Sequence, residues 1–307
     1  MNQNDEAHCR RIVRNHARTF WLASRFLPAG KRRAAFALYA FCRVADDMVD
    51  VGGGTGGDVA LLLAEYRRKL GDALNGRPEG PVFRELARAA GVYGVPPEVL
   101  HELLDGVGRD CAPRLYQSWE DLSEYCEGVA SSVGEMCAHV FGIVGGAAQR
   151  AEALAHARTL GIAMQLTNVL RDVGEDALSG RCYLPQADLA RFGLSVDEVL
   201  GGRIGADSRW RSLMTFEVAR ARELYARATP GIALLSPDAR ACAGACAVGY
   251  AGILGAIEAI EYDTFSARAR LGALARASVL WSAWRSSRGA AGPERDVART
   301  EEVATWA

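Results

Sequence analysis

Two groups of acidic residues, far apart in the chain, each lie within a stretch of apolar and alanine-rich sequence. The first group spans residues 46–50 and the second spans residues 168–176. Both stretches are typical of helices, and on a helix residues four apart project from one face. The residues that share a face are Asp46 and Asp50 in the first group, and Asn168, Asp172 and Asp176 in the second.

These two faces constrain the fold, because like charges on one face repel each other unless a cation lies between them. Two such helices facing each other would form a cleft lined with carboxylate and amide oxygens. Mg²⁺ favours such oxygens together with the phosphates of a substrate. The sequence therefore predicts two helices that meet around a metal and phosphate site.

The first helix carries further polar residues on the same side, at steps of three and four residues. These residues are Tyr39 and Arg43, which come before Asp46, and Asp47, which follows it directly. Residues 34–45 are otherwise mostly apolar. A helix that is apolar at most positions is buried, and burial of carboxylates without cations is costly. We therefore interpret this face as functional. The alternative is a solvated surface with an ordinary Arg–Asp pair.

The second helix adds an amide to its acidic face, and two arginines lie beside or after it. Gln165 lies one turn before Asn168, and Arg171 is offset by one residue from Asp172. After a break at residues 179–180 comes the segment 181–185, which begins with Arg181. Arginines in such places can hold phosphate oxygens. The alternative is a charged helix end without a ligand.

Composition predicts one all-α domain. Helix formers dominate the 307 residues, only ten prolines occur, and glycine and proline breaks separate about ten helical segments. No run of alternating polar and apolar residues is long enough to predict a strand. A chain of this length buries a large core, and no linker interrupts it before residue 285. We expect a domain over residues 1–285 and a flexible tail over residues 286–307.

Charge and cysteine content exclude several classes of protein. The net charge of −1 gives no support for nucleic-acid binding. The eight cysteines include no Cys-x-x-Cys pair, so we expect no zinc site and a reducing, cytoplasmic location. The N-terminus has no apolar signal region. The uncharged run 241–257 is shorter than the roughly 20 residues of a membrane span, so we interpret it as a core helix. Peripheral membrane contact stays open.

Several segments resemble the squalene/phytoene synthase family, and within it the bacterial phytoene synthases. The resemblance covers roughly residues 8–285 and includes Arg-x-Tyr-x-Pro after the second acidic group. The matching segments are residues 19–28, 37–50, 125–134, 165–176, 180–185 and 262–265 with Arg268. The resemblance implies a single-domain isoprenoid-synthase helical bundle around a central cavity. It also implies Mg²⁺-dependent head-to-head condensation of two prenyl diphosphates, with Mn²⁺ as an alternative ion.

The resemblance also assigns roles to residues. The implied metal ligands are Asp46, Asp50, Asn168, Asp172 and Asp176. The implied diphosphate contacts are Arg18, Thr19, Tyr39, Arg43, Gln165, Arg171, Tyr183 and Arg268. Of these two sets, we expect Asp46, Asp50, Asp172, Asp176, Tyr39, Arg43, Arg171 and Tyr183 to be catalytic. Apolar cavity walls for the prenyl chain are expected from Phe20, Ser24, Val129, Ala130, Val133, Gly134 and Tyr250.

The family pattern implies a cyclopropyl diphosphate intermediate that rearranges and loses a proton. We see no convincing dinucleotide site, which favours proton loss over hydride transfer from NADPH. Phe20 and Ser24 share a face near the expected pocket wall, and a small Ser24 leaves room for a long substrate. This favours two geranylgeranyl diphosphates, giving phytoene, the first committed step of carotenoid biosynthesis.

Other functions stay open at this point. The nearest is a dehydrosqualene, squalene or presqualene diphosphate synthase that uses farnesyl diphosphate. Head-to-tail prenyl elongases and terpene cyclases also have paired acidic motifs, but Arg-x-Tyr-x-Pro points away from them. An inactive relative would have lost aspartates, and none is lost here. A di-iron bundle would need Glu-x-x-His pairs, whereas Glu135/His139 and Glu152/His156 are spaced one residue further apart.

Overall fold

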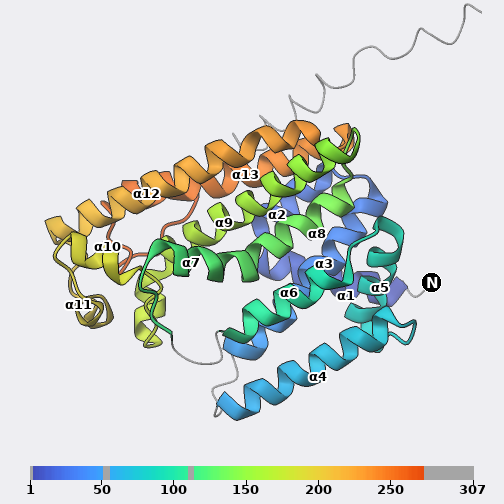
Figure 1. Cartoon of the computed structure of the whole chain (residues 1–307), viewed down its shortest axis with the longest axis horizontal. Coiled ribbons are helices and arrows are strands. Elements are labelled where there is room, and N and C mark those ends of the chain that lie inside the picture. Colours follow the sequence, from blue (N-terminus) through green and yellow to red (C-terminus); the bar gives the residue numbers. More distant parts are fainter. Residues whose placement is uncertain (1–2, 51–55, 110–113, 273–307) are drawn as a thin grey trace, which may run out of the picture.

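The computed structural model describes residues 3–50, 56–109 and 114–272 (Figure 1). Over these residues the chain forms helices and one isolated antiparallel bridge between Ile143 and Leu235, with no strand. The all-α prediction is therefore confirmed. The expected tail over residues 286–307 lies outside the described residues, so it stays a prediction.

The helices follow one another with short connections. In chain order they are α1 (Gln3–His16), α2 (Arg18–Ala23), η1 (Ser24–Phe26), α3 (Ala29–Asp50), α4 (Gly56–Leu74), α5 (Gly80–Tyr93), α6 (Pro97–Gly108), α7 (Trp119–Cys126), the π-helix η3 (Glu127–Ser131), α8 (Ser132–Phe141), α9 (Ala147–Leu178), α10 (Gln186–Arg191), α11 (Val196–Gly201), α12 (Ser208–Ala228), η4 (Thr229–Leu234) and α13 (Pro237–Ala259).

Most helix ends occur where glycine or proline predicts them. Gly94 ends α5 with a φ of 64° and Gly202 ends α11 with a φ of 66°, and glycine adopts this left-handed conformation at little cost. Proline occupies the first position of α6 and of α13, where its missing N–H leaves no bond unmade. Pro185 precedes α10 and Gly193, with a φ of 68°, follows it, but the sequence analysis did not separate the short helices α10 and α11.

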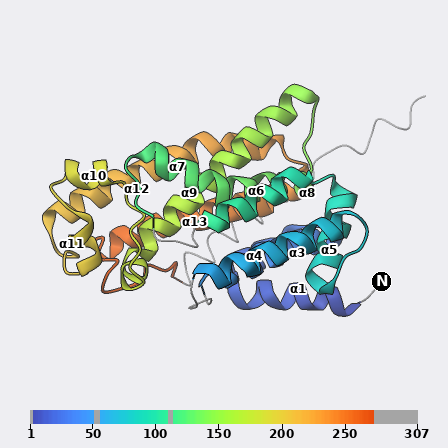
Figure 2. The same ribbon diagram turned by 60° about the horizontal axis from the view of Figure 1, so that its bottom comes forward.

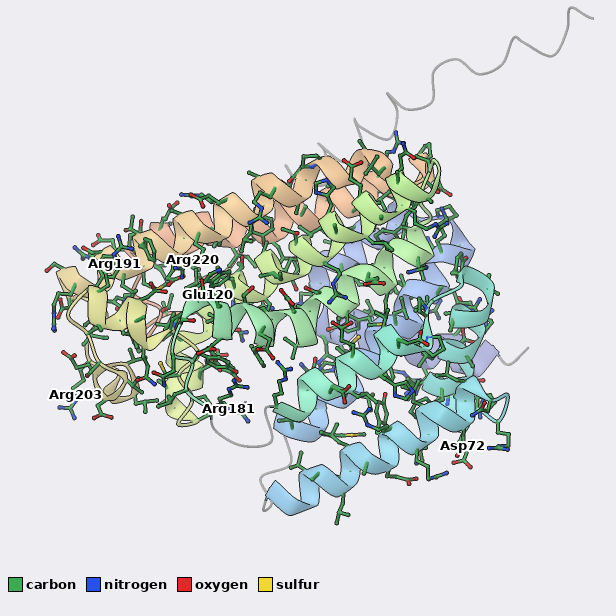
Figure 3. The ribbon with its side chains drawn as sticks, in the orientation of Figure 1. Asp72, Glu120, Arg181, Arg191, Arg203 and Arg220 are labelled. Carbon is green, nitrogen blue, oxygen red and sulfur yellow. The ribbon has the colours of Figure 1, made fainter. Side chains whose placement is uncertain are left out.

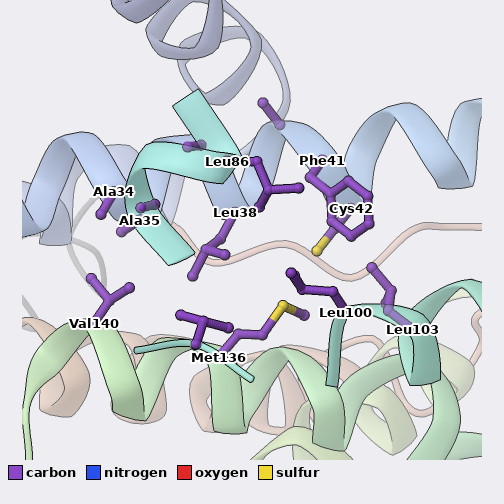
Figure 4. Packing of buried hydrophobic residues seen from close by; sticks show 14 of the residues in the cluster. Ala34, Ala35, Leu38, Phe41, Cys42, Leu86, Leu100, Leu103, Met136 and Val140 are labelled. Carbon is purple, nitrogen blue, oxygen red and sulfur yellow. The ribbon is translucent and has the colours of Figure 1, made fainter. Parts of the chain in front are cut away.

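Two clusters of buried side chains form the core. One joins α3, α5, α6 and α8, where Leu38, Phe41, Leu86, Leu100 and Met136 interlock (Figure 4). The other surrounds α9 and α12 and includes the fully buried Trp210. Each buried leucine or phenylalanine contributes about 1.5–3 kcal/mol relative to an exposed one. The bundle is thus stabilised on both sides of α9.

Helix α9 is the centre of the arrangement (Figures 1 and 2). It packs against α7, α8, α11, α12 and α13, while α3 packs against α8 on the other side. The C-terminal ends of α3 and α9, which carry the two acidic groups, lie toward the same end of the bundle in Figure 1. The fold therefore brings the acidic groups to one region although they are far apart in the chain.

Glycines allow α9 to lie very close to the helices beside it. A Cβ at Gly161 would come 2.2 Å from the carbonyl oxygen of Ala130 in η3. A Cβ at Gly134 in α8 would likewise come 2.2 Å from the carbonyl oxygen of Ala157. Contacts this short have no room for a side chain. The crossing of α9 with the η3–α8 segment therefore depends on these two glycines.

Within the described part of the chain, Pro237–Ala259 is the helix that is long and apolar enough to cross a membrane. It packs against α2, α9, α12, η1 and η4, and many of its alanine and cysteine side chains are buried inside the bundle. These contacts agree with the interpretation of residues 241–257 as a core helix.

Candidate active site

The first acidic group lies at the C-terminal end of α3. Arg43 forms an ion pair with Asp47 one turn away, and Asp46 is exposed. The expectation of a fully buried acidic face is therefore wrong for Asp46, because α3 is buried along residues 34–45 and emerges where its acidic end begins. The side chain of Asp50 lies outside the described part of the structure.

The second acidic group is held by two arginines. Arg171 Nε donates to Asp172 Oδ1 at 2.7 Å, and a second bond joins the same two side chains. Arg268 Nη2 donates to Asp172 Oδ2 at 3.1 Å, and its Nη1 lies 3.1 Å from Glu175 Oε2. Two guanidinium groups therefore compensate the charge of one half-buried carboxylate, as repulsion within an acidic helix face requires.

The chain after α13 is shaped to bring Arg268 to this place. Glu261 and Tyr262 have φ values of 51° and 64°, a conformation uncommon for residues other than glycine. Trp210 Nε1 donates to the carbonyl of Tyr262 at 2.9 Å and fixes the turn. Gly174, inside the acidic group, lets the backbone of residues 264–265 approach α9, since a Cβ there would lie 2.6 Å from the Thr264 carbonyl oxygen.

Two tyrosines connect the acidic helices electrostatically. Burial raises the pKa of Tyr39 on α3, and Tyr250 and Asp46 raise it further. Burial also raises the pKa of Tyr250 on α13, where Arg171 acts in the opposite direction and Asp172 adds to the rise. Tyr250 on α13 therefore lies near Tyr39 of α3 and near Arg171 and Asp172 of α9.

The amide of Asn168 and the guanidinium of Arg43 each have a buried atom without a hydrogen-bond partner. Asn168 donates to Gln165 Oε1 at 3.2 Å, but its own Oδ1 is buried without a partner. Arg43 Nε is likewise buried without a partner. A buried acceptor beside carboxylates suits a hard cation, and a buried N–H beside them suits an anionic oxygen. The donor set therefore fits Mg²⁺ with a diphosphate.

The carboxylates do not form a ready-made metal cluster. Among the residues described, no group of three or more His, Cys, Asp or Glu side chains is close enough to hold a metal ion. Asp172 is engaged by arginines, and the fifth expected ligand, Asp50, has no described side chain. The implied ligand set of Asp46, Asp50, Asn168, Asp172 and Asp176 stays a prediction.

The Arg-x-Tyr-x-Pro segment lies beside the acidic end of α9. Arg181 N donates to the carbonyl of Asp176 at 2.9 Å, and Figure 3 shows the Arg181 side chain at this end of the bundle. Tyr183 stacks on Tyr125 and Tyr116, with ring centroids 5.4 and 5.9 Å apart. This aromatic stack fixes the predicted site residue Tyr183.

The N-terminal site residues lie on α2 and η1. Phe20 stacks on Tyr39 with ring centroids 6.1 Å apart, which joins it to the predicted site. Arg18 is exposed and Thr19 half-buried. Ser24 is 1% exposed, and its hydroxyl donates to the carbonyl of Trp21 at 2.9 Å. The small side chain is therefore enclosed by protein at this position.

The expected apolar walls have different roles. Val129, Ala130 and Val133 are half-buried along η3 and α8. Gly134 instead serves the crossing of α8 with α9 described above. Residues Val129 and Ala130 lie in a π-helix, an irregularity that is frequent at functional sites. The sequence pattern gave no sign of this π-helical turn.

Sequence reasoning missed the groups that hold the site residues in place. Tyr116 and Glu175 contact Tyr183 and Arg268 respectively. Glu175 directly precedes Asp176, so its charge was visible, but its partner Arg268 is far away in the chain. The buried polar groups of α10 and α12 were also missed, although the spacing of Glu217 and Arg220 is that of an intrahelical pair.

Comparison with known proteins identifies relatives over most of the chain. The family model for squalene/phytoene synthase matches residues 13–275. The 15-cis-phytoene synthase of Synechococcus elongatus is 38% identical, with 85% of this chain and 86% of the relative covered. The phytoene synthase of Arthrospira platensis is 36% identical over the same shares. A crystal structure of a dehydrosqualene synthase in complex with ligand matches with a TM-score of 0.84 and 30% identity, covering 94% of this chain and 98% of that one.

Proposed function

Because the chain belongs to the squalene/phytoene synthase family, we propose that it is a phytoene synthase. It is a prenyltransferase that joins two geranylgeranyl diphosphates head to head, through a cyclopropyl diphosphate, to phytoene. The observation in the structure that carries this proposal is the pair of arginines, Arg171 and Arg268, bonded to Asp172 of the second acidic group. A prenyl diphosphate needs this combination of charges at its polar end and apolar walls along its chain.

The arginines serve the departure of diphosphate. When the allylic carbon–oxygen bond breaks, negative charge develops on the leaving group and positive charge on the prenyl chain. Arg43, Arg171 and Arg268 are cationic groups already oriented by carboxylates at this place. Fixed positive charges that meet a developing anion lower the barrier, because they need no reorganisation during the reaction.

The oxygen donors of the two acidic groups would hold Mg²⁺, with Mn²⁺ as the alternative ion. Bound there, the metal would supply positive charge to the leaving diphosphate. The proposed ligands are those that the resemblance implies, namely Asp46, Asp50, Asn168, Asp172 and Asp176. The buried and unpartnered Asn168 Oδ1 supports this assignment within the described structure.

Two tyrosines at the site stay protonated, so neither presents a phenolate that could capture a carbocation. Burial raises the pKa of Tyr39 and of Tyr250, so both phenols keep their protons. These two phenols thus offer no strong nucleophile to the cation, which then loses a proton.

A product assay tests this proposal. The purified protein is incubated with Mg²⁺ and either geranylgeranyl or farnesyl diphosphate, with and without NADPH, and the hydrocarbons are analysed by mass spectrometry. We expect phytoene from geranylgeranyl diphosphate without NADPH. Activity with farnesyl diphosphate alone would instead indicate dehydrosqualene synthase, or squalene synthase if the product depends on NADPH. Accumulation of the cyclopropyl diphosphate would indicate presqualene diphosphate synthase.

We further propose that the enzyme is cytoplasmic and contacts a membrane peripherally, because the prenyl chains of its substrates and its hydrocarbon product are hydrophobic. Exposed leucines support this contact: Leu61 on α4 is 71% exposed and Leu178, the last residue of α9, is 91% exposed. The first turns of α4 and the end of α9 lie toward the end of the bundle that carries the acidic groups (Figure 1). A membrane there would accept the hydrocarbon as it leaves.

Vesicle flotation tests this contact. A variant with Leu61→Ser and Leu178→Ser should bind vesicles of phosphatidylcholine and phosphatidylglycerol less than the unchanged protein does. The control is Val92→Ser on α5, which removes a side chain that is 63% exposed elsewhere. Equal flotation of the double variant and the unchanged protein, or no flotation of either, would refute the contact at these residues.

A further inference from the structure

A buried polar cluster outside the acidic site joins α10 to α12. Arg220 Nη1 donates to Glu217 Oε1 at 2.7 Å and to Oε2 at 2.8 Å, and also to Asp188 Oδ2 at 2.9 Å. Glu217 is 0% exposed and Asp188 is 9% exposed. Two buried carboxyl groups therefore share a single guanidinium nitrogen.

Aromatic rings hold this guanidinium in place. Its carbon lies 4.7 Å from the ring centroid of Trp119 on α7 and 4.7 Å from that of Phe216 on α12. Arg191 on α10 lies 4.6 Å from the centroid of Phe216. Figure 3 shows Arg220 with Arg191 and Glu120 at the meeting of these helices. The cluster thus connects three helices through one arginine.

The cluster is connected to the active site through α10. Gln186 N donates to the carbonyl of Tyr116 at 2.8 Å, and Ala187 N donates to that of Gln117 at 3.0 Å. The residues just before them form the segment 181–185, whose Tyr183 ring stacks on Tyr116. At its other end, this segment is bonded to the acidic end of α9 by Arg181 N and the Asp176 carbonyl. The segment is therefore fixed at both ends, and Asp188 anchors one of them.

We propose that Arg220, Asp188 and Glu217 are positioning residues for the site segment Arg181–Tyr183, and that a proton on the buried carboxyl pair tightens this anchor. The role of that segment in binding diphosphate rests on the proposed function. The anchor itself rests on the hydrogen bonds and burial given above. None of the three residues need contact the substrate, since they act through α10.

Charge balance explains the role of the proton. One guanidinium cannot neutralise two buried carboxylates, so a proton on the pair removes the excess negative charge. Burial raises the pKa of Glu217 to about 7, with Arg220 opposing the rise and Asp188 adding to it. The other charged groups facing the cluster are Arg191 on α10 and the exposed Glu120 on α7. Above that pH, Glu217 repels Asp188 and the hold on α10 weakens.

Two variants separate anchoring from folding. Asp188→Ala removes the acceptor on α10, and Glu217→Gln keeps the shape of the protonated acid but cannot ionise. The readouts are hydrogen exchange at the Gln186 and Ala187 amides, and KM and kcat for geranylgeranyl diphosphate from pH 6 to 8.5. The controls are Asp197→Ala, an exposed carboxylate on α11, and Val199→Ala, which lowers stability from a buried position in the same region.

We expect Asp188→Ala to speed exchange at both amides and to raise KM by about tenfold, the usual effect of losing one charge-assisted hydrogen bond, with little change in kcat. In the unchanged enzyme, KM should rise with pH through about 7. In Glu217→Gln it should stay at its low-pH value. The two controls should leave the KM and both amides unchanged.

Two results would overturn the proposal. One is an Asp188→Ala variant that loses thermal stability as Val199→Ala does, while its KM and the exchange rates at both amides stay unchanged. The other is an identical pH profile in Glu217→Gln and the unchanged enzyme. If the unchanged protein makes no hydrocarbon, the proposed function fails. The anchoring role of Asp188 is then tested separately. The readouts are hydrogen exchange at the Gln186 and Ala187 amides and, in place of KM, the affinity for inorganic pyrophosphate with Mg²⁺.

Discussion

Arg268 and Asp172, which are 96 residues apart in the chain, form a two-point contact at the second acidic group. Arg268 Nε lies 3.0 Å from Asp172 Oδ1, and Nη2 donates to Oδ2 at 3.1 Å. Gly174 makes this contact possible because it lets the segment before Arg268 pack directly on α9. The last described part of the chain thus joins a candidate site whose other residues come from α2, α3, α9, α13 and the segment 181–185.

Replacement of Arg268 by Gln should weaken diphosphate binding. A charge-assisted hydrogen bond is worth about 1.5–3 kcal/mol, so we expect KM to rise by about tenfold or more. The measurement is steady-state kinetics with geranylgeranyl diphosphate. Arg222→Gln is the matched control, since Arg222 forms a similar two-point contact with Glu258 away from the site. Equal effects of the two substitutions would contradict a role for Arg268 in the site.

Replacement of Gly161 by Ala should destabilise the bundle. The added Cβ would meet the Ala130 carbonyl oxygen at 2.2 Å, and backbone cannot move aside as a flexible side chain can. Overpacking of this kind typically costs about 1–3 kcal/mol. Chemical denaturation measures the change. Gly91→Ala in α5 has open space around the new methyl group and should stabilise by about 0.5–1 kcal/mol. Unchanged stability of Gly161→Ala would show that α9 can shift.

The stability of the fold should depend on pH through Glu217. Its pKa is raised from 4.5 to about 7, so the folded protein holds a proton that the unfolded chain has lost between these values. The free energy of unfolding therefore falls as pH rises across this window, by about 3 kcal/mol for this group. Glu217→Gln should lack this loss. The measurement is urea denaturation at pH 5 and pH 8. The free energy of unfolding of Glu217→Gln, relative to that of the unchanged protein, should be higher at pH 8 than at pH 5. An equal difference at the two pH values would contradict the raised pKa of Glu217.

Ser24 should influence the length of the substrate. Ser24 is 1% exposed, so a phenylalanine there would displace neighbouring protein, and it would narrow the cavity that the sequence predicts beside Phe20. We expect Ser24→Phe to shift preference toward farnesyl diphosphate. The measurement is the product ratio when both diphosphates compete, with Ser24→Ala as a control that removes only the hydroxyl. An unchanged ratio in Ser24→Phe would refute this assignment.

The helical fold could be predicted from sequence because it depends on local patterns. Glycine and proline mark the helix ends, and the spacing of Asp172 and Asp176 is visible without any tertiary information. The resemblance to a family then supplied roles that spacing alone cannot give. Those roles stay predictions, and the structure adds that Tyr250 lies near both Tyr39 and Asp172.

Contacts between distant residues could not be predicted. The resemblance implied that Arg268 contacts diphosphate, but it gave no sign of its bonds to Asp172 and Glu175. The bond between Arg220 and Asp188 crosses 32 residues and joins two helices. The exposure of Asp46 depends on where α3 leaves the bundle, and this is set by neighbouring helices rather than by its own apolar pattern.

The rate of hydrocarbon formation in single-aspartate variants tests the central claim that both acidic groups form one site. The assay uses geranylgeranyl diphosphate and Mg²⁺ with Asp46→Asn, Asp172→Asn and, as a control, Asp72→Asn on α4, which lies far from the site (Figure 3). We predict a loss of at least about 100-fold for the first two, because each removes charge that the reacting diphosphate complex needs, and little change for the third. Full activity in either Asp46→Asn or Asp172→Asn would contradict the account.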